Sequence, residues 1–161
     1  MIVLGIDPGY ERVGIAILEK NNKGESLIYS ECFQTSKEDS FTKRLSQISK
    51  EIESVVKKYH PQFLSIENLF FNKNKKTIMR VSEVRGAIIN LCLSKGLEVR
   101  EFTPLQIKVA VTGYGRSDKK QVISMVKNLI TIDETIRFDD EFDAIAVGLT
   151  FFATEKMNQY V

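Results

Sequence analysis

Short apolar runs of the kind that form β-strands mark the first 35 residues of the chain. The runs, which are rich in β-branched residues, cover residues 2–7, 13–18 and 27–35. Pro8-Gly9 separates the first two runs, and residues 21–24 (Asn-Asn-Lys-Gly) separate the others; both segments are strong turn formers. Strands linked by such short turns predict an antiparallel meander.

Helical spacing begins after this meander, where apolar residues recur at steps of three and four. These residues are Phe41, Leu45, Ile48, Ile52, Val55, Val56 and Tyr59. Further helices are predicted over residues 76–95, from Thr103-Pro104 to Gly113, after a cap at Ser117, and from about residue 140 to residue 155. Apolar runs at residues 63–67 and 97–102 predict two more strands.

The order of these elements predicts an α/β fold. Residues 63–67 follow a long helix, and a helical crossover places such a strand parallel to the first strand. We therefore expect a five-stranded mixed sheet with three antiparallel strands, two parallel strands and helices on both faces. A chain of 161 residues has the size of one ordinary domain, so we expect residues 1–161 to form a single domain.

The composition is typical of a soluble globular protein, with 43% hydrophobic and 27% charged residues. No stretch approaches the ~20 apolar residues of a membrane-spanning helix, and no leader pattern precedes the first strand. Cys32 and Cys92 have the spacing of neither a zinc site nor a redox pair. We expect a cytoplasmic protein with no membrane partner.

Charge is distributed unevenly, although the formal net charge is only +2. Residues 72–85 contain five basic residues and one acid, for a local net charge of +4, and residues 105–127 have the same balance. Residues 133–143 contain six acids and one arginine, for a local net charge of −5. The combination favours a polyanion partner beside a concentrated carboxylate site, although each stretch alone also fits a solvated surface.

Four acids lie where this fold brings chain segments together. Asp7 ends the first strand and Glu67 ends the strand expected beside it, so both carboxylates fall at one edge of the sheet. Asp140 and Asp143 are three residues apart and share a face of the last helix. Clustered carboxylates without histidine or cysteine suit Mg²⁺ or Mn²⁺, and two such ions support phosphodiester hydrolysis.

Each acid also has a structural explanation when it is taken alone. Asp7 fits a tight turn, Glu67 a surface position at a strand end, and Asp140 a helix N-cap. Asp139 competes with Asp140, because helix starts are uncertain by a few residues and only the spacing to Asp143 separates the two. The hypothesis of a joint site therefore depends on the convergence of all four acids.

Five motifs, in order from Met1 to about Phe152, resemble the RuvC family of Holliday junction resolvases. They are GIDPGYERVG with Asp7, IENLFFNKN with Glu67, EVRGAI, TPLQIKVAVTGYGRSDKKQV, and DEFDAIAVGL with Asp140 and Asp143. The resemblance implies a ribonuclease H-like fold and a homodimer that makes paired symmetric nicks in four-way DNA junctions, in homologous recombination and DNA repair. It also implies that the four acids are catalytic and bind Mg²⁺, with Mn²⁺ as a substitute and two ions per site.

The resemblance further implies contacts to DNA and to other proteins. It implies the RuvA-RuvB branch-migration complex as a partner, Phe70 near the exchange point of the junction, and Lys108 and Lys119 beside the DNA backbone. From the residues alone, Phe70 and Phe71 suit base stacking from a lysine-rich loop. The expected DNA-binding residues are Phe70, Phe71, Lys73, Lys75, Lys76, Arg80, Lys108, Lys119 and Lys120.

Three other functions stay open at this point. An ATP-binding protein of the sugar kinase and actin type has a similar first turn, but that fold needs two such domains and a second phosphate loop. A ribonuclease H-like nuclease that acts on another nucleic acid would carry the same acids. A non-catalytic junction-binding protein would bind junctions without nicking them in Mg²⁺.

Overall fold

The computed structural model describes residues 1–69, 75–132 and 136–158, with the backbone alone for residues 75, 76 and 156–158. Its first part contains β1 (Ile2–Asp7), β2 (Arg12–Asn21), β3 (Gly24–Gln34), α1 (Phe41–Tyr59) and β4 (Phe63–Glu67). Its second part contains α2 (Lys75–Ser94), β5 (Glu98–Phe102), α3 (Pro104–Thr112), α4 (Lys119–Leu129) and α5 (Asp139–Asn158). The order of elements is the one that the sequence predicts.

The sheet is mixed, and its strands lie in the order β3-β2-β1-β4-β5. β2 pairs antiparallel with both β1 and β3. β4 pairs in parallel with both β1 and β5. The predicted arrangement of three antiparallel strands followed by two parallel ones is therefore confirmed.

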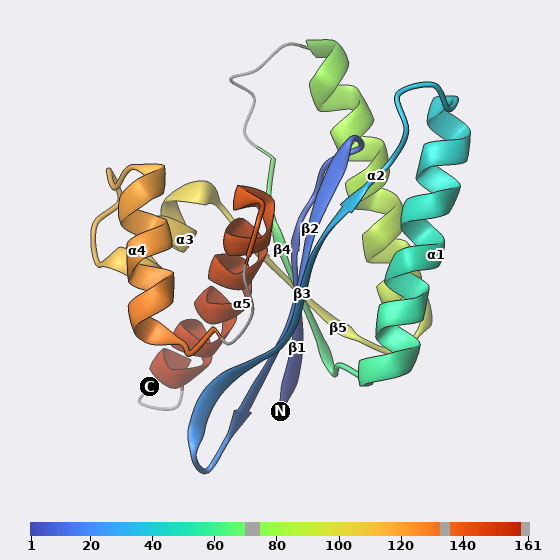
Figure 1. Ribbon diagram of the computed structural model, residues 1–161. Coiled ribbons are helices and arrows are strands. Elements are labelled where there is room, and N and C mark those ends of the chain that lie inside the picture. Colours follow the sequence, from blue (N-terminus) through green and yellow to red (C-terminus); the bar gives the residue numbers. More distant parts are fainter. Residues whose placement is uncertain (70–74, 133–135, 159–161) are drawn as a thin grey trace.

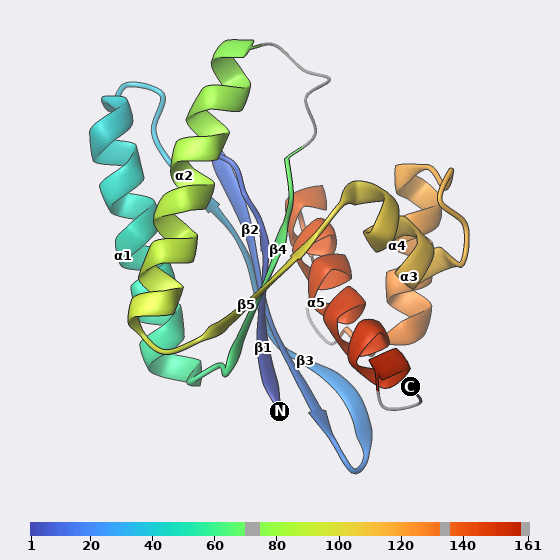
Figure 2. The same cartoon turned by 180° about the vertical axis from the view of Figure 1, so that it is seen from behind.

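Helices cover both faces of this sheet. Figures 1 and 2 show α1 and α2 on one face and α3, α4 and α5 on the other. Because side chains alternate along a strand, each strand contributes to both cores. Leu4 and Ile6 of β1 belong to the core beneath α1 and α2, whereas Val3 belongs to the core beneath α5. The odd-numbered residues of β1, Asp7 included, therefore face α5.

The hairpin between β2 and β3 is longer than predicted, and α5 begins one residue earlier, at Asp139. The two strands continue to a short turn, with Lys20 opposite Glu25 and Asn21 opposite Gly24. These added residues are mostly polar and are held by backbone pairing, which the pattern of apolar residues does not reveal.

The start of α4 corrects another prediction, because its N-cap is Asp118 and not Ser117. The Asp118 side chain accepts a 2.9 Å hydrogen bond from the backbone N–H of Gln121, and the Gln121 side chain accepts one from the backbone N–H of Asp118. Ser117 is buried, and its hydroxyl donates to the carbonyl oxygen of Tyr114. The cap of α3 at Thr103 is as predicted.

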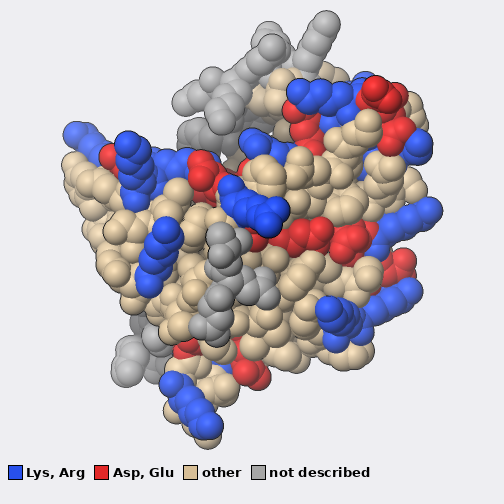
Figure 3. Space-filling model, viewed as in Figure 1, with Lys and Arg blue, Asp and Glu red and all other residues tan. Residues whose placement is uncertain are grey.

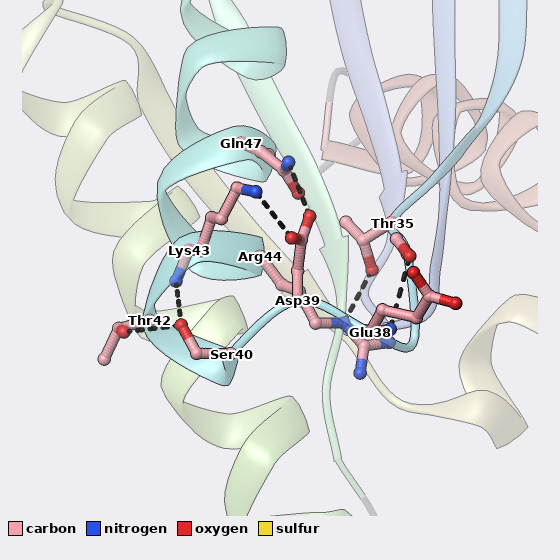
Figure 4. A network of polar contacts seen from close by, with 9 residues as sticks. Thr35, Glu38, Asp39, Ser40, Thr42, Lys43, Arg44 and Gln47 are labelled. Atoms are coloured by element: carbon pink, nitrogen blue, oxygen red, sulfur yellow. Dashed lines mark hydrogen bonds and ion pairs between the residues drawn. The ribbon is translucent and has the colours of Figure 1, made fainter.

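A polar network lies at the start of α1 (Figure 4), and Thr35 links it to the turn that follows β1. Ser40 caps the helix, and the buried Arg44 donates through Nε to the hydroxyl of Thr35 at 2.8 Å. Thr35 donates to the carbonyl oxygen of Tyr10 at 2.6 Å, and the Arg44 guanidinium lies 4.8 Å from the centre of the Tyr10 ring. The segment just after Asp7 is thus anchored to α1.

No helix in the part of the chain that the structure describes is long and apolar enough to cross a membrane. Cys92 is buried, Cys32 is partly buried, and both are free thiols.

Candidate active site

Asp7 and Glu67 lie at the same edge of the sheet, at the ends of two adjacent strands. β1 and β4 pair in parallel and end in register. Val3 and Phe63, an even number of residues before the two acids, pack in the core beneath α5. Both carboxylates therefore project toward α5, the helix that carries the other two acids.

Glycines let α5 approach the sheet closely at this edge. A Cβ atom at Gly14, which is opposite Asp7 in the pairing of β1 with β2, would collide with the carbonyl oxygen of Asp140. A Cβ atom at Gly5 would collide with the carbonyl oxygen of Ala144. The motif GIDPGYERVG thus supplies both an acid and the space that admits the backbone of α5.

A buried hydrogen bond sets the position of α5 along β4. The hydroxyl of Ser65, two residues before Glu67, donates to the carbonyl oxygen of Val147 at 2.7 Å. Val147 lies about one helical turn after Asp143. The bond therefore links the strand that carries Glu67 to the helix that carries Asp143, close to both acids.

The four acids act on one another electrostatically. Burial raises the pKa of Asp7 well above its ordinary value of 3.8, and the charges of Glu67, Asp143 and Asp140 raise it further. Lys119 acts in the opposite direction without offsetting them. Burial also raises the pKa of Asp143, although its hydrogen bond with Lys119 opposes that change. The cluster therefore carries more negative charge than the surrounding protein compensates.

Basic side chains contact both proposed site acids of α5, Asp140 and Asp143. Arg12 Nε lies 3.4 Å from Asp140 Oδ2, and Lys119 Nζ lies 2.9 Å from Asp143 Oδ2. Lys119 also lies 3.5 Å from Asp139, whose side chain is 63% exposed and is not among the groups that raise the pKa of the β1 carboxyl. Asp140 thus raises the pKa of both Asp7 and Asp143, whereas Asp139 raises that of Asp143 only.

Two pockets meet at Glu67. One, of about 210 Å³, is lined by Glu67, Asp143, Lys108 and Lys119 together with apolar residues of α3, α4 and α5. The other, of about 270 Å³, is lined by Asp7 and Glu67 on the side of α2. Figure 3, in the view of Figure 1, shows Lys and Arg side chains at the left, over α4, and others at the centre and the right. The acids thus border open space beside a basic surface.

Known proteins resemble this chain along nearly its whole length. The family model described as crossover junction endodeoxyribonuclease RuvC matches residues 3–151. The chain belongs to the RuvC family. It is 47% identical over 150 residues to the crossover junction endodeoxyribonuclease RuvC of Finegoldia magna, which covers 92% of this chain and 91% of the relative. The RuvC of Thermosipho melanesiensis is 47% identical over 148 residues, with 92% and 94% covered.

A solved RuvC structure has the same fold. The structure of Thermus thermophilus RuvC in complex with a Holliday junction substrate superposes with a TM-score of 0.90 at 27% identity, and the match covers 98% of this chain and 96% of that one. The ribonuclease H-like fold implied by the five motifs is confirmed by this match.

The carboxylates of this RuvC-family chain fit a hard divalent cation by their chemistry. All four are oxygen donors, and a cation among them would lower the pKa of Asp7, which burial and the neighbouring acids raise. In the present side-chain positions, no group of three or more acids, histidines or cysteines among the described residues is arranged to hold a metal ion. Arg12 and Lys119 contact Asp140 and Asp143 instead, so a cation would compete with them.

The lysines expected near the DNA backbone of a RuvC-family enzyme lie in two different settings. Lys108 and Lys119 line the pocket that contains Glu67. Lys120 is exposed and is not part of that lining. The structure therefore distinguishes Lys119 from its neighbour, which the residues alone did not.

The expected DNA-binding residues between 70 and 80 are described only in part. Phe70, Phe71 and Lys73 fall outside the described residues, and of Lys75 and Lys76 only the backbone is described. Arg80 pairs with Glu83 at 3.0 Å, and its guanidinium lies 4.1 Å from the centre of the Phe41 ring.

Sequence reasoning missed three residues that shape the site: Arg12, Gly14 and Ser65. A buried polar residue in the apolar run FLSIE was a usable signal for Ser65, because such a hydroxyl needs a partner. Gly14 had a signal too, since a glycine inside a strand often marks a close backbone approach. The contact of Arg12 with Asp140 had none, because it depends on how α5 crosses β2.

Proposed function

We propose that this chain resolves Holliday junctions by hydrolysing one phosphodiester bond in each of two opposed DNA strands. As a member of the RuvC family, it is an endodeoxyribonuclease of DNA recombination and repair. The observation that carries the site assignment is the convergence of four acids from β1, β4 and α5 at one edge of the sheet. We take residues 1–161 as a single nuclease domain.

Asp7, Glu67, Asp140 and Asp143 are the proposed catalytic and metal-binding residues, for two Mg²⁺ ions or Mn²⁺ in their place. When bound, such ions supply an activated water and neutralise charge on the leaving oxygen. The four carboxylates supply the oxygen ligands, and a nearby cation lowers the pKa of Asp7, which burial and the neighbouring acids raise, so that this carboxyl stays ionised. No carboxylate then has to act as the general base.

Lys108 and Lys119 are proposed to hold the DNA backbone at this site. Both line the pocket that contains Glu67 and Asp143. An ammonium group at this position neutralises a phosphate and stabilises the negative charge that develops during cleavage. For Lys119 this requires leaving Asp143, to which it now donates at 2.9 Å. The other proposed DNA-binding residues are Phe70, Phe71, Lys73, Lys75, Lys76, Arg80 and Lys120.

A homodimer would present two such sites to opposed strands of one junction. We place the contact between protomers at α2, which exposes the large apolar side chains of Met79 and Leu93. The complex of the T. thermophilus relative with a Holliday junction substrate supports the proposed substrate. The RuvA-RuvB branch-migration complex is the proposed partner, and the cytoplasm is the proposed compartment.

The test is cleavage of an end-labelled four-way junction, compared with matched linear duplexes, in Mg²⁺. We expect symmetric nicks in the junction, little cutting of the duplexes, and no cutting by Asp7→Asn, which should still bind the junction in EDTA. Glu98→Gln, at an exposed acid of β5 that pairs with Arg100, is the matched control and should cleave normally.

Two results would contradict the proposal. Equal cutting of duplex and junction would favour a ribonuclease H-like nuclease with another substrate. A shifted band without nicks in the wild-type reaction would favour a non-catalytic binding protein.

A further inference from the structure

The motif EVRGAI, residues 83–88, resembles the RuvC family but contributes none of the proposed catalytic or DNA-binding residues. Its arginine, Arg85, lies in the middle of α2 and counts toward the basic stretch of residues 72–85. Its side chain is only 15% exposed, however, so it does not share the solvated surface of that stretch. A partly buried arginine needs partners for those of its five N–H donors that water does not reach, and these partners indicate its role.

Arg85 binds the end of the strand that carries Glu67. Its Nε donates to the backbone carbonyl oxygen of Glu67 itself at 3.0 Å. Its terminal nitrogen donates to the carboxylate of Glu101, which lies on β5, the strand next to β4. In the pairing of these strands, Glu101 is opposite Ile66, the residue before Glu67. One guanidinium thus joins α2 to both strands at the level of the active-site acid.

The bonds of Arg85 are suited to orienting Glu67. β4 ends at this residue, and the next backbone N–H, that of Asn68, donates to the carbonyl oxygen of Phe102 at 2.7 Å. A donor held against the Glu67 carbonyl restrains rotation of that peptide plane, and with it the direction in which the Glu67 side chain leaves the strand. Because a displacement of about 1 Å at a reacting centre costs about 10²-fold in rate, such a restraint has a measurable effect.

We propose that Arg85 is a positioning residue for Glu67, acting through the carbonyl group of that residue and held in place by Glu101. It does not contact the DNA. The inference deepens the proposed function and rests on it, because it gives Glu67 a role as a metal ligand. It also assigns a purpose to EVRGAI, the one resembling motif that has no place in the site.

The test compares Arg85→Ala, Arg85→Lys and Glu101→Gln with a matched control, Arg100→Ala. Arg100 lies beside Glu101 on β5 but pairs with the exposed Glu98 at 3.4 Å, away from Glu67. Three quantities are measured well below each variant's Tm: Mn²⁺ binding without DNA, by electron paramagnetic resonance; kcat and KM for junction cleavage; and junction affinity in EDTA.

For Arg85→Ala we expect kcat to fall about 10- to 100-fold, the usual effect of losing a group that orients a metal ligand. The Mn²⁺ concentration for half-saturation should rise by a similar factor, while junction affinity stays within about twofold because the DNA contacts are intact. Arg85→Lys should recover part of the loss, since one ammonium can still reach the Glu67 carbonyl. Glu101→Gln should lie between wild type and Arg85→Ala, and Arg100→Ala should match wild type.

Several results would overturn this inference while leaving the proposed function intact. If Arg85→Ala lowers Tm but keeps kcat and Mn²⁺ binding, the residue only joins α2 to the sheet. If it weakens junction binding at unchanged kcat, Arg85 contacts DNA. Failure of the proposed function is distinct, because then the wild-type protein itself does not cleave junctions in Mg²⁺.

Discussion

The two acids on strands and the two acids on α5 reach the same site by different means. Asp7 and Glu67 end paired strands, so backbone hydrogen bonds of the sheet place them. Asp140 and Asp143 lie in the first turns of α5 and depend on how closely that helix packs on the sheet. Asp140 and Asp143 also form ion pairs, with Arg12 and Lys119 respectively. Changes in packing should therefore displace Asp140 and Asp143 more than Asp7 and Glu67. A metal ion that binds Asp140 or Asp143 would also compete with the basic side chains that contact them.

We expect the largest difference in cleavage rate between variants of two neighbouring acids of α5, Asp140 and Asp139. Asp140→Asn should lower the rate of junction cleavage by at least about 10³-fold, or about 4 kcal/mol, because it removes a ligand of the metal site. Asp139→Asn removes only an exposed ion pair with Lys119, so cleavage should stay within about fivefold of wild type. The measurement is single-turnover cleavage of a labelled junction at saturating Mg²⁺.

If Asp139→Asn were inactive and Asp140→Asn active, Asp139 and not Asp140 would be the residue of α5 that belongs to the site with Asp143. It would also mean that the close approach of the Asp140 backbone to Gly14 does not bring the Asp140 side chain into the site. Junction binding in EDTA separates either outcome from misfolding.

The packing of α5 should be broken by Gly14→Ala. A glycine inside a strand ordinarily gains stability on substitution by alanine, but here the new Cβ would collide with the Asp140 carbonyl. We expect a loss of about 1–3 kcal/mol in the free energy of unfolding. Gly14→Val, although valine favours strands, should lose more, and cleavage should fall with it as Asp140 moves. Urea unfolding measures the first quantity; equal or higher stability of Gly14→Ala would contradict the close approach.

The burial of Asp7 and its repulsion by the neighbouring acids should make the stability of the protein depend on pH. The pKa of Asp7 is raised on folding, so the folded state binds its proton more tightly than the unfolded state does. Stability therefore falls as pH rises from the ordinary value of 3.8 through the raised pKa. In EDTA at pH 8 we expect Asp7→Asn to have a higher Tm than wild type, by about 2–4 °C for each kcal/mol gained when the buried charge and its repulsion are removed.

That advantage should shrink as the pH is lowered through the raised pKa of Asp7, and it should vanish below 3.8, where the wild-type carboxyl is protonated in both states. Mg²⁺ should reverse it, because only the wild-type site gains stability by binding the ion. A Tm of Asp7→Asn below that of wild type throughout, in scanning calorimetry, would show that Asp7 stabilises the free protein.

Much of the fold could be predicted because local and global signals agree. The order of apolar runs and helical spacing placed Asp7 and Glu67 at matching strand ends, and the pairing of β1 with β4 confirms that expectation. The cap of α4 was predicted wrongly although the sequence holds the answer. Counting three residues on from Asp118 reaches Gln121, which completes a capping box, whereas three on from Ser117 is a lysine, which cannot accept the bond.

The rest could not be predicted because it depends on contacts between distant segments. Arg12 meets Asp140 only after α5 has packed across β2, and Arg85 meets Glu67 only after α2 has packed on β4. In the sequence, Arg85 counted only as one positive charge of residues 72–85, and Arg12 lay outside both basic stretches. Charge summed over a stretch of chain therefore predicts a polyanion partner, but it does not tell which cations face solvent and which serve the site.

The smallest effect tests competition for the α5 acids. The side chain of Arg12 is 52% exposed, so its ion pair with Asp140 contributes at most about 1 kcal/mol. Arg12→Ala should therefore lower the Mn²⁺ concentration for half-saturation, measured without DNA, by about two- to fivefold. Lys37→Ala, which removes a cation paired with Glu11 in the same region, should leave it unchanged. A rise for Arg12→Ala would mean that Arg12 holds Asp140 in position for the ion, and does not compete with it. The sign of this small effect thus decides whether the basic contacts of α5 oppose the metal site or prepare it.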